Sequence, residues 1–485
     1  MSSIHNVRSR HFKQDIRSAI ADVELRGALA RAQEQVNSKR SKAVDAIADD
    51  WESMREKARS IKAWTLEHLG EQLELFESNA TRNGIKVHWA KDPDSACSLV
   101  KDICSQADAR SVIKSKSMVT EEIGLNAVLE ASGMEVVESD LGEWIVQIAG
   151  ETPSHIVAPA IHRSRKSVHA LFEKTLQRSI PDDAESMTMV AREVLRKAFL
   201  RADVGITGVN YLIAETGSFL VLENEGNQRL TTSLPRVHIA IAGLEKVLPR
   251  LADLDLFLRM IGRSGTGQVV TTYQNLFSGP KQDPAEDGPE EMHMVLVDNG
   301  RSELLASERR RQTLQCIRCG ACLNICPVYR QIGGHAYGSV YPGPIGSIFT
   351  PPVAGLHQAS QLPYASSLCG ACRDVCPVKI DIPAVLLDLR EEIAGDDAQK
   401  RDAETDLKVR RETPAFRHWA RAMHSPTRYR IAGFFMRCAA GIASRTTVLD
   451  RFIPPLAAWR SERSVPRPEG DTFRNRWKAR GRQAR

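Results

Sequence analysis

Hydrophobic residues in the first eighty or so positions recur at the spacing of an α-helix. Leu66, Leu69 and Leu73 stand three and four residues apart, and Leu25 and Leu29 have the same spacing. Apolar positions at this period form one buried stripe on a helix. The pattern predicts a helical arm over residues 1–83, which we do not expect to be a catalytic centre.

From residue 84 onward, short apolar runs alternate with amphipathic segments. Helices are predicted at residues 93–106, 121–131 and 187–202, and the first follows Asp92-Pro93, an N-cap residue and a first-turn proline. Strands are predicted at residues 86–90, 111–113, 134–138, 155–159, 235–243, 268–273 and 292–298, with two more between residues 204 and 227. Such alternation indicates a mostly parallel sheet covered by helices, so we expect an α/β domain over residues 84–302.

Length and composition narrow the class of protein. A chain of 485 residues with 42% hydrophobic residues is expected to form two or three domains. The best candidate for a membrane helix, residues 431–443, is shorter than the ~20 residues needed to cross a bilayer and is interrupted by Arg437. The first residues have no apolar core of a secretory leader. We therefore expect a cytoplasmic protein, with peripheral contact at the inner face of the membrane as the alternative.

Two runs of cysteines carry the strongest chemical signal. The first run has Cys316, Cys319, Cys322 and Cys326 at the spacing C-x2-C-x2-C-x3-C, followed by Pro327. In iron–sulfur proteins, three thiolates of such a run bind one [4Fe-4S] cluster and the fourth binds another cluster. The run therefore predicts a protein that carries electrons.

The second run repeats the first at a constant offset of fifty positions, from Cys319 to Cys369 and from Cys326 to Cys376. In the two-cluster arrangement each run lends its last cysteine to the other cluster. We therefore expect cluster 1 to bind Cys316, Cys319, Cys322 and Cys376, and cluster 2 to bind Cys326, Cys369 and Cys372.

The same offset places Ser366 where the first run has Cys316, so cluster 2 lacks one thiolate. Three outcomes are open. The centre could be [3Fe-4S], it could be [4Fe-4S] with a non-cysteine or exogenous fourth ligand, or the Ser366 oxygen could be the ligand. An open iron corner could tune the potential, or it could bind a substrate hydroxyl and carboxylate as a Lewis acid.

Structural zinc is the competing interpretation of the cysteines, because paired C-x2-C runs also form tetrahedral zinc sites. Three features favour iron–sulfur clusters: the total of seven cysteines in the two runs, the C-x2-C-x2-C triplet, and the proline after each final cysteine. The remaining cysteines, Cys97, Cys104 and Cys438, are expected to be small buried hydrophobes.

The C-terminal region is strongly basic. Residues 401–485 contain 20 Lys or Arg against 8 Asp or Glu, a balance of +12, whereas the whole chain has a net charge of +6. Aromatic residues lie among these arginines, but no nucleic-acid-binding motif is present and we expect no nucleic acid. Docking on an anionic partner is favoured, and acidic lipid is the alternative. We expect a two-cluster domain over residues 303–395 and a basic region over 396–485.

Candidate ligand-binding residues follow the predicted strands, where open α/β sheets gather their ligands. They are Lys114, Lys116, Glu215, Glu225 and Asn227. The two lysines could hold a carboxylate, although solvated loop charges or structural contacts are the more ordinary interpretation of these five residues. No dinucleotide fingerprint is present, and no arrangement of Ser, His, Asp or Cys indicates a catalytic nucleophile.

Along nearly its whole length the chain resembles the lactate utilisation protein B family of bacterial iron–sulfur proteins. Besides the two cysteine runs, the resemblance rests on Ala214-Glu-Thr-Gly-Ser218, Glu225-Gly-Asn227, Gly334-His-Ala-Tyr-Gly338, Tyr341-Pro-Gly-Pro-Ile-Gly346 and Ser366-Ser-Leu-Cys-Gly-Ala-Cys372. It implies an α/β LUD domain similar to the sugar-isomerase and CoA-transferase group, an α-helical ferredoxin-like domain with two clusters, and a basic helical C-terminal region. Ser366 in place of a fourth cysteine is also expected from the resemblance.

The resemblance further implies a role in the oxidation of L-lactate to pyruvate. The chain would be an electron-transfer subunit without turnover of its own, working with a cysteine-rich redox partner and a smaller LUD-domain partner. As an alternative, it would be the catalytic subunit and bind a 2-hydroxy acid at the three-cysteine cluster and the LUD domain. A regulatory or scaffold protein is a third hypothesis. Catalytic residues cannot be assigned from the sequence.

Overall fold

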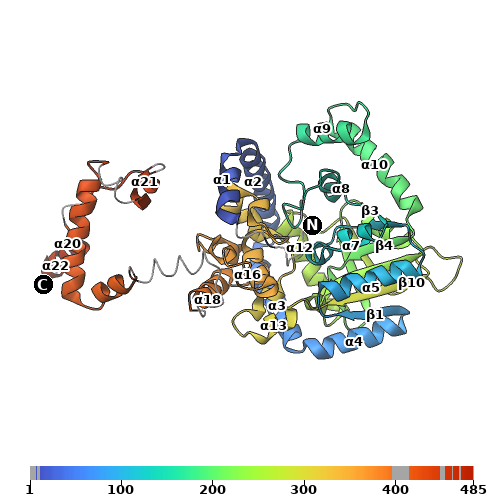
Figure 1. Cartoon of the computed structure of the whole chain (residues 1–485). Helices are drawn as coiled ribbons and strands as arrows, with labels where there is room; N and C mark the ends of the chain where they lie inside the picture. The colour runs from blue at the N-terminus through green and yellow to red at the C-terminus, as the bar shows by residue number, and fades with distance from the viewer. Residues whose placement is uncertain are drawn as a thin grey trace. The chain divides into compact units, whose positions relative to one another are not determined.

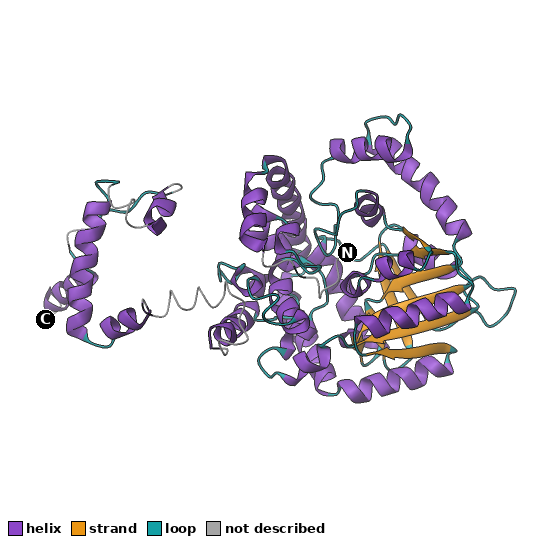
Figure 2. Ribbon diagram, viewed as in Figure 1, coloured by secondary structure: helices purple, strands orange, loops and turns teal. Residues whose placement is uncertain are grey.

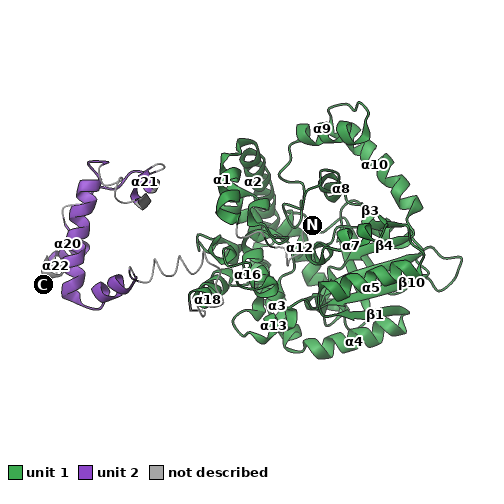
Figure 3. Ribbon diagram, viewed as in Figure 1, with its two compact units in different colours: residues 1–400 green, residues 401–485 purple. Residues whose placement is uncertain are grey.

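The structure is a computed structural model of the whole chain, and it describes residues 7, 11–395, 414, 416–447, 454–460, 463–468 and 471–483. The chain divides into two compact units, residues 1–400 and residues 401–485 (Figure 3).

Four helices begin the first unit, as the spacing of apolar residues predicts. They are α1 (Phe12–Ala21), α2 (Val23–Asp45), α3 (Ala48–Glu67) and α4 (Leu69–Arg82). The Asp22 side chain caps α2 by accepting a hydrogen bond from the Leu25 amide. Leu69, Leu73 and Phe76 form the buried stripe of α4, which packs against the first strand of the main sheet.

The main sheet has six strands, all parallel, in the order β1-β10-β7-β4-β2-β3 (Figures 1 and 2). The strands are β1 (Ile85–Ala90), β2 (Ser111–Lys114), β3 (Glu135–Glu138), β4 (Val204–Gly208), β7 (Val237–Gly243) and β10 (Glu291–Val297). Helices α5 (Pro93–Gln106), α6 (Met118–Ile123) and α7 (Leu125–Ala131) pack on the face that holds Val112. Helices α8 (Leu141–Ile148), α9 (Arg165–Leu176) and α10 (Ala184–Arg201) pack with Ile113, on the opposite face. The predicted parallel α/β sheet is confirmed.

A second, four-stranded sheet was not predicted. Its strands are β8 (Val247–Leu248), β5 (Tyr211–Ile213), β6 (Ser218–Glu223) and β9 (Tyr273–Phe277), in that order. The β5–β6 turn contains Gly217 at φ 66°, and a Cβ atom there would lie 2.2 Å from the Ala80 amide nitrogen. Only glycine therefore lets this hairpin approach α4 so closely.

Three predicted elements are wrong in detail. Residues 155–159 form an irregular loop instead of a strand, because the His155 ring accepts hydrogen bonds from the amides at 157 and 158. The strand predicted at 268–273 begins only at Tyr273, since the Asn224 side chain holds the preceding Thr272 in a turn. The helix predicted at 121–131 is two helices, α6 and α7, which meet at the left-handed Gly124.

The rest of the first unit is helical. After α11 (Asn227–Ser233) and α12 (Leu254–Gly265), the helices are α13 (Arg301–Ala306), α14 (Ala321–Ile325), α15 (Pro327–Ile332), α16 (Gly343–Ala354), α17 (Ala371–Val375) and α18 (Ile382–Gly395). The second unit contains α20 (Pro426–Ala443), α21 (Pro454–Arg460) and α22 (Phe473–Gln483).

Helix α20 exposes a group of apolar side chains, Phe434, Phe435 and Met436. Cys438, also on α20, is exposed, so the prediction that it packs in a core is wrong, whereas Cys97 and Cys104 are buried as predicted. Within the described part of the chain, no helix combines the length and the hydropathy of a membrane-spanning segment.

A buried ion network connects the main sheet to the helical domain that follows it. Arg301, at the start of α13, donates to Glu122 of α6 at 2.8 Å and to Glu245 beyond β7 at 2.6 Å. Glu245 is also 3.4 Å from Arg318. Burial alone would raise the pKa of Glu245, but the two guanidinium groups lower it below its usual range. The network therefore stays ionised at neutral pH.

Replacing Arg301 by Met is expected to destabilise the fold by about 3–5 kcal/mol, because it leaves Glu122 and Glu245 buried without their main partner. Urea unfolding followed by circular dichroism measures this loss. Arg236→Met is the control, since the half-exposed Arg236 only approaches Glu290 and Glu291 at 3.8 and 3.7 Å, and we expect it to cost less than about 1 kcal/mol. Equal losses in the two variants would show that the network does not stabilise the fold.

Candidate metal centre and adjoining cavity

The two cysteine runs fold into two loops of the same local geometry. Arg318 and Leu368 correspond to each other and both have left-handed backbones, at φ 58° and 56°. Gly320 and Gly370 also correspond, at φ 77° and 85°, and each precedes a short helix, α14 or α17. The repeat seen in the sequence is therefore a structural repeat as well.

Four cysteines surround one small apolar cavity. It is lined by Cys316, Cys319, Cys322 and Cys376, together with apolar residues such as Ile345 and Ile380. Burial raises the pKa of the Cys322 thiol far above its usual range, and Cys316, Cys319 and Cys376 raise it further. Cys376, from the second run, thus lies with the first three cysteines of the first run.

The other three cysteines form a second group. The pKa of Cys372 is raised to about 12, mainly by burial and to a lesser extent by the neighbouring Cys326 and Cys369. The pKa of Cys326 is raised by burial and by Cys369. Cys369 is exposed, whereas Cys326 and Cys372 are buried.

The two groups suit a metal–sulfur cluster. Backbone amides point at the sulfur atoms, with Arg318 donating to Cys316 at 3.4 Å, Tyr329 to Cys326 at 3.5 Å and Ile380 to Cys376 at 3.4 Å. Such amides stabilise thiolates, which are the ligand form that metal binding requires. Among the described residues, no three His, Cys, Asp or Glu side chains gather tightly enough to ligate one metal ion. In a [4Fe-4S] cluster, by contrast, the four thiolates bind four separate iron atoms.

The loops differ in what covers them. A Cβ atom on Gly320 would meet His155 and Val157 at 3.1 Å, whereas one on Gly370 would meet nothing within 4 Å. The N-terminal helices also contact both runs through hydrogen bonds to backbone carbonyls, from Gln33 to Leu323, from Asn37 to Asn324, from Arg40 to Val375 and from Arg55 to Cys376. The helical arm therefore supports the cysteine loops directly.

His155 joins the α/β domain to the first cysteine loop. Its Nδ1 accepts hydrogen bonds from the amides of Val157 and Ala158, and its Nε2 lies 3.1 Å from Oδ1 of Asn324 in α14. Nε2 must therefore carry the proton and donate to Asn324. Burial and the nearby Lys116 lower the pKa of His155 to about 3, so the ring is neutral. Sequence reasoning missed this role, because the partner of His155 is 169 residues away.

A larger cavity of about 490 Å³ adjoins the first cysteine loop. Segments that follow β2, β4 and β7 line it at the carboxyl ends of the strands. Strands β2 and β4 are neighbours in the sheet, but the chain continues from β2 to β3 on one side and from β4 to β7 on the other side. The cavity therefore lies at a topological switch point, which is where such sheets bind ligands. Ile156, Arg318 and Cys319 line both this cavity and the small one, and thus form the wall between them.

Only some of the predicted ligand-binding residues reach this cavity. Lys116 and Glu225 line it. Lys114 is fully buried and pairs with Glu138 at 2.7 Å, and Glu215 accepts a hydrogen bond from the Leu251 amide. Asn227 is buried in α11 and does not line the cavity. The structural interpretation therefore holds for three of the five residues.

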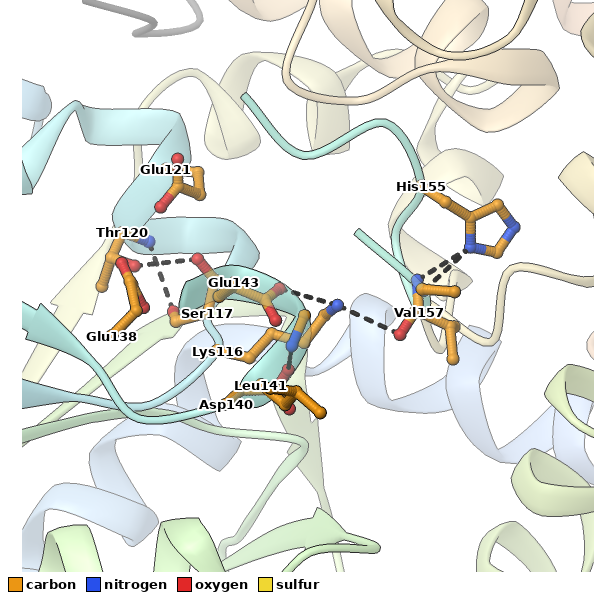
Figure 4. A network of polar contacts seen from close by, with 12 residues as sticks. Lys116, Ser117, Thr120, Glu121, Glu138, Asp140, Leu141, Glu143, His155 and Val157 are labelled. Carbon is orange, nitrogen blue, oxygen red and sulfur yellow. Dashed lines mark hydrogen bonds and ion pairs between the residues drawn. The ribbon is translucent and has the colours of Figure 1, made fainter. Parts of the chain in front are cut away.

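Lys116 is itself held in place. Its ammonium group donates to the Val157 carbonyl at 3.1 Å and pairs with Glu143 at 2.8 Å (Figure 4). Asp140 caps α8 by accepting a hydrogen bond from the Gly142 amide. Burial and the Asp140 carboxylate raise the pKa of Glu225 to about 7, so this carboxyl group exchanges its proton near neutral pH.

Two further cations line the cavity without full pairing. Among the described residues, the Lys246 ammonium has no hydrogen-bond or ion-pair partner, and Nη1 of Arg318 is buried without one. Burial lowers the pKa of Lys246 to about 8, and Arg318 contributes to the shift although Glu245 opposes it. The Arg318 guanidinium lies 4.4 Å from the ring centroids of both Tyr341 and Phe349. Sequence reasoning did not identify either cation.

The fold and the cysteine loops define the class of protein. The chain matches the family models of a LUD domain over residues 73–297 and of a 4Fe-4S dicluster domain over residues 312–380. It is thus an iron–sulfur protein in which an α/β LUD domain is followed by a two-cluster domain.

A third model, lactate utilisation protein B, C-terminal, matches residues 388–482. Lactate utilization protein B from Bacillus cytotoxicus is 40% identical over 97% of this chain and 98% of its own length. The protein of the same name from Shouchella clausii is 41% identical over 97% of both chains. "Uncharacterized electron transport protein YkgF" from Escherichia coli is 40% identical over 96% of both chains. The chain belongs to the lactate utilization protein B family.

Two buried tyrosines lie beside the cysteine groups. Tyr211 is close to Cys316 and Cys319, and Tyr337 is close to Cys326. The Tyr211 hydroxyl has no hydrogen-bond partner among the described residues, and the Tyr337 hydroxyl lies within hydrogen-bond reach of the Cys326 sulfur. Each can therefore donate to cluster sulfur, and hydrogen bonds of this kind raise the reduction potential of a cluster.

With the ligand assignment that the cysteine spacing predicts, Tyr337→Phe is expected to lower the midpoint potential of cluster 2 more than that of cluster 1, because the Tyr337 hydroxyl acts mainly on Cys326 and only weakly on Cys322. Redox titration followed by EPR measures both potentials. The matched variant Tyr211→Phe is expected to lower the potential of cluster 1 alone. If both variants keep the wild-type potentials, the two hydroxyls do not donate to the clusters.

Proposed function

We propose that the chain passes electrons from the oxidation of L-lactate to pyruvate through two iron–sulfur clusters. Its membership of the lactate utilization protein B family and its 4Fe-4S dicluster match support this role. The observation that carries the proposal is the apolar cavity lined by Cys316, Cys319, Cys322 and Cys376, since it joins the two runs as a two-cluster protein requires.

In the proposed assignment, these four cysteines bind cluster 1, and Cys326, Cys369 and Cys372 bind cluster 2. The clusters supply one-electron transfer when they are bound. The residues of the chain bury cluster 1, direct amide groups at its sulfur ligands and leave part of the loop of cluster 2 accessible. The parallel sheet also suits the proposed likeness of the LUD domain to the sugar-isomerase and CoA-transferase group.

Ser366 is the proposed fourth ligand of cluster 2. Its Oγ accepts a hydrogen bond from the Leu368 amide at 3.1 Å, and the Cys316 sulfur accepts one from the Arg318 amide at 3.4 Å. The donor in each case is the left-handed residue two positions later. Both Ser366 and Cys316 are partly buried. The serine oxygen therefore has the local environment that the cysteine sulfur has in the first loop.

Partners are proposed to reach the chain at the loop of cluster 2, because Cys369 is exposed and Gly370 has open space beside it. We propose a cysteine-rich redox partner and a smaller LUD-domain partner. The basic C-terminal region, with Phe434, Phe435 and Met436 exposed on α20, is proposed to dock on an anionic surface of a partner or on acidic lipid at the membrane.

The alternative, catalysis at the three-cysteine cluster and the LUD domain, is not favoured. The large cavity of the α/β domain is lined by Cys319, a residue of the four-cysteine group, and by none of Cys326, Cys369 and Cys372. A substrate in that cavity would therefore lie beside the cluster that has a full set of thiolates.

The relay predicts how the clusters respond to L-lactate. In the anaerobic complex with its partner subunits, L-lactate is expected to reduce the clusters and produce their reduced EPR signals. The isolated chain is expected to bind about eight iron atoms but to stay oxidised when L-lactate is added. In the complex, Cys319→Ala should abolish the signal of cluster 1, whereas the control Cys97→Ala, at a buried cysteine of α5, should keep both signals. Reduction of the isolated chain by L-lactate would contradict the relay.

Removal of the Ser366 hydroxyl is expected to convert cluster 2. Ser366→Ala should lose about one iron atom per chain and give the EPR signal of an oxidised [3Fe-4S] centre, because a fourth ligand is missing. Ser366→Cys should keep [4Fe-4S] at a higher midpoint potential, since oxygen is a harder ligand than sulfur and favours oxidised iron. Ser367→Ala, at the exposed neighbouring serine, is the control.

The reciprocal substitution tests the equivalence of the two loops. Cys316→Ser should give cluster 1 an oxygen ligand and lower its potential without loss of iron. If Ser366→Ala has the iron content and the spectrum of the wild type, Ser366 is not a ligand.

A further inference from the structure

The 490 Å³ cavity of the α/β domain has the features of a binding site for a small anion. It lies at the switch point of the parallel sheet, and two cations that line it, Lys246 and Arg318, retain donors without a partner among the described residues. Nη1 of Arg318 is buried, where a donor without a partner is costly, and Lys246 is partly buried beside it. A ligand that supplies negative charge at this place would therefore be bound by both.

The charges of the cavity favour a monoanion. Four basic and four acidic side chains line it, so the cavity as a whole is close to neutral. Of the basic groups, Lys116 already pairs with Glu143, and Arg301 pairs with Glu122 and Glu245. The remaining donors, the Lys246 ammonium and Nη1 of Arg318, match the two oxygen atoms of one carboxylate. A phosphate dianion would face the lining carboxylates with too few free cations.

The position of the cavity connects such a ligand to cluster 1. Among the described residues, only Ile156, Arg318 and Cys319 line both cavities, and they form the wall between them. The surface of the small cavity is almost entirely apolar. Charges on the two sides of this shared wall interact more strongly than in water, because the medium between them has a low dielectric constant.

We propose that the cavity binds a small organic carboxylate through Lys246 and Arg318, and that the bound charge lowers the reduction potential of cluster 1. A negative charge beside the cluster opposes the addition of an electron. By linkage, reduction of the cluster weakens carboxylate binding by the same factor. The effect on the cluster rests on the proposed function, whereas the binding itself does not.

Glu225 and Asp140 indicate what else the ligand carries. Both line the cavity, and Glu225 gains and loses a proton near pH 7. A carboxyl group in this state can donate a hydrogen bond to an oxo group or accept one from a hydroxyl group. A carboxylate with an oxygen substituent therefore fits the lining better than acetate does.

Isothermal titration calorimetry with anaerobically purified, cluster-loaded protein tests the site. Pyruvate, L-lactate, acetate and inorganic phosphate are the probes, and pyruvate or L-lactate is expected to bind with one site per chain. Lys246→Met should weaken binding about tenfold or more, because one charge-assisted hydrogen bond is lost. Lys246→Arg should keep most of the affinity, and the remote surface variant Lys86→Met, with the side chain 57% exposed on β1, should keep all of it.

A second readout tests the coupling. Saturating ligand is expected to shift the EPR-monitored midpoint potential of cluster 1 to a lower value and to leave cluster 2 unchanged. The dithionite-reduced protein is expected to bind the same probe more weakly than the oxidised protein. In Lys246→Met these shifts should require about tenfold more ligand than in the wild type, a change that a merely structural role of Lys246 would not produce.

Several results would overturn the proposal. The site is wrong if no carboxylate binds, if phosphate alone binds, or if Lys246→Met binds like the wild type. The coupling is wrong if a carboxylate binds but both potentials stay unchanged. Carboxylate binding by a chain whose clusters L-lactate cannot reduce through the partner subunits would leave the site intact and contradict the relay instead.

Discussion

A buried chain of alternating charges, Glu122–Arg301–Glu245–Arg318, connects the parallel sheet to the first cysteine loop. The two inner members, Arg301 and Glu245, each have an opposite charge on both sides. The free-energy cost of burying each ion is therefore offset only while its neighbours stay in place. Arg318 stands between Cys316 and Cys319 in a left-handed conformation. The position of this turn, and with it the wall between the two cavities, therefore depends on ions supplied by the segments that follow strands β2, β7 and β10.

The same network explains why two loops of nearly identical backbone differ in environment. Arg318 of the first loop packs on Tyr341 and Phe349 and reaches Glu245, whereas Leu368, its counterpart, has no charge to anchor. His155 and Val157 close over Gly320, but nothing lies over Gly370. Burial and hydrogen bonds to sulfur are the levers by which a protein sets cluster potentials. A duplicated motif has thus been placed in two different settings without a change in its local geometry.

The sequence predicts features that depend on residues close together in the chain. The spacing of the cysteines, the Asp92 cap of α5 and the parallel strands follow from such local patterns. The loop at His155 does not, because its conformation depends on Asn324 and on the polarity of its own ring. The start of β9 depends on the distant Asn224 side chain in the same way. Likewise, Lys246 becomes a candidate ligand-binding residue only when the fold brings it to the same cavity as Arg318.

On the proposed assignment, exposure increases along the path from the sheet to the surface. The large cavity lies against Cys319, cluster 1 is enclosed by apolar residues, and the loop of cluster 2 ends at the exposed Cys369. Cys326 of the first run binds cluster 2, and Cys376 of the second run binds cluster 1. Each cluster is therefore held by both runs, and the distance between the clusters does not depend on a hinge. A relay built in this way exchanges electrons with partners at one exposed end, while the buried end responds to charge within the α/β domain. The two loops therefore differ in function because different residues cover them, since the spacing of their ligands is nearly the same.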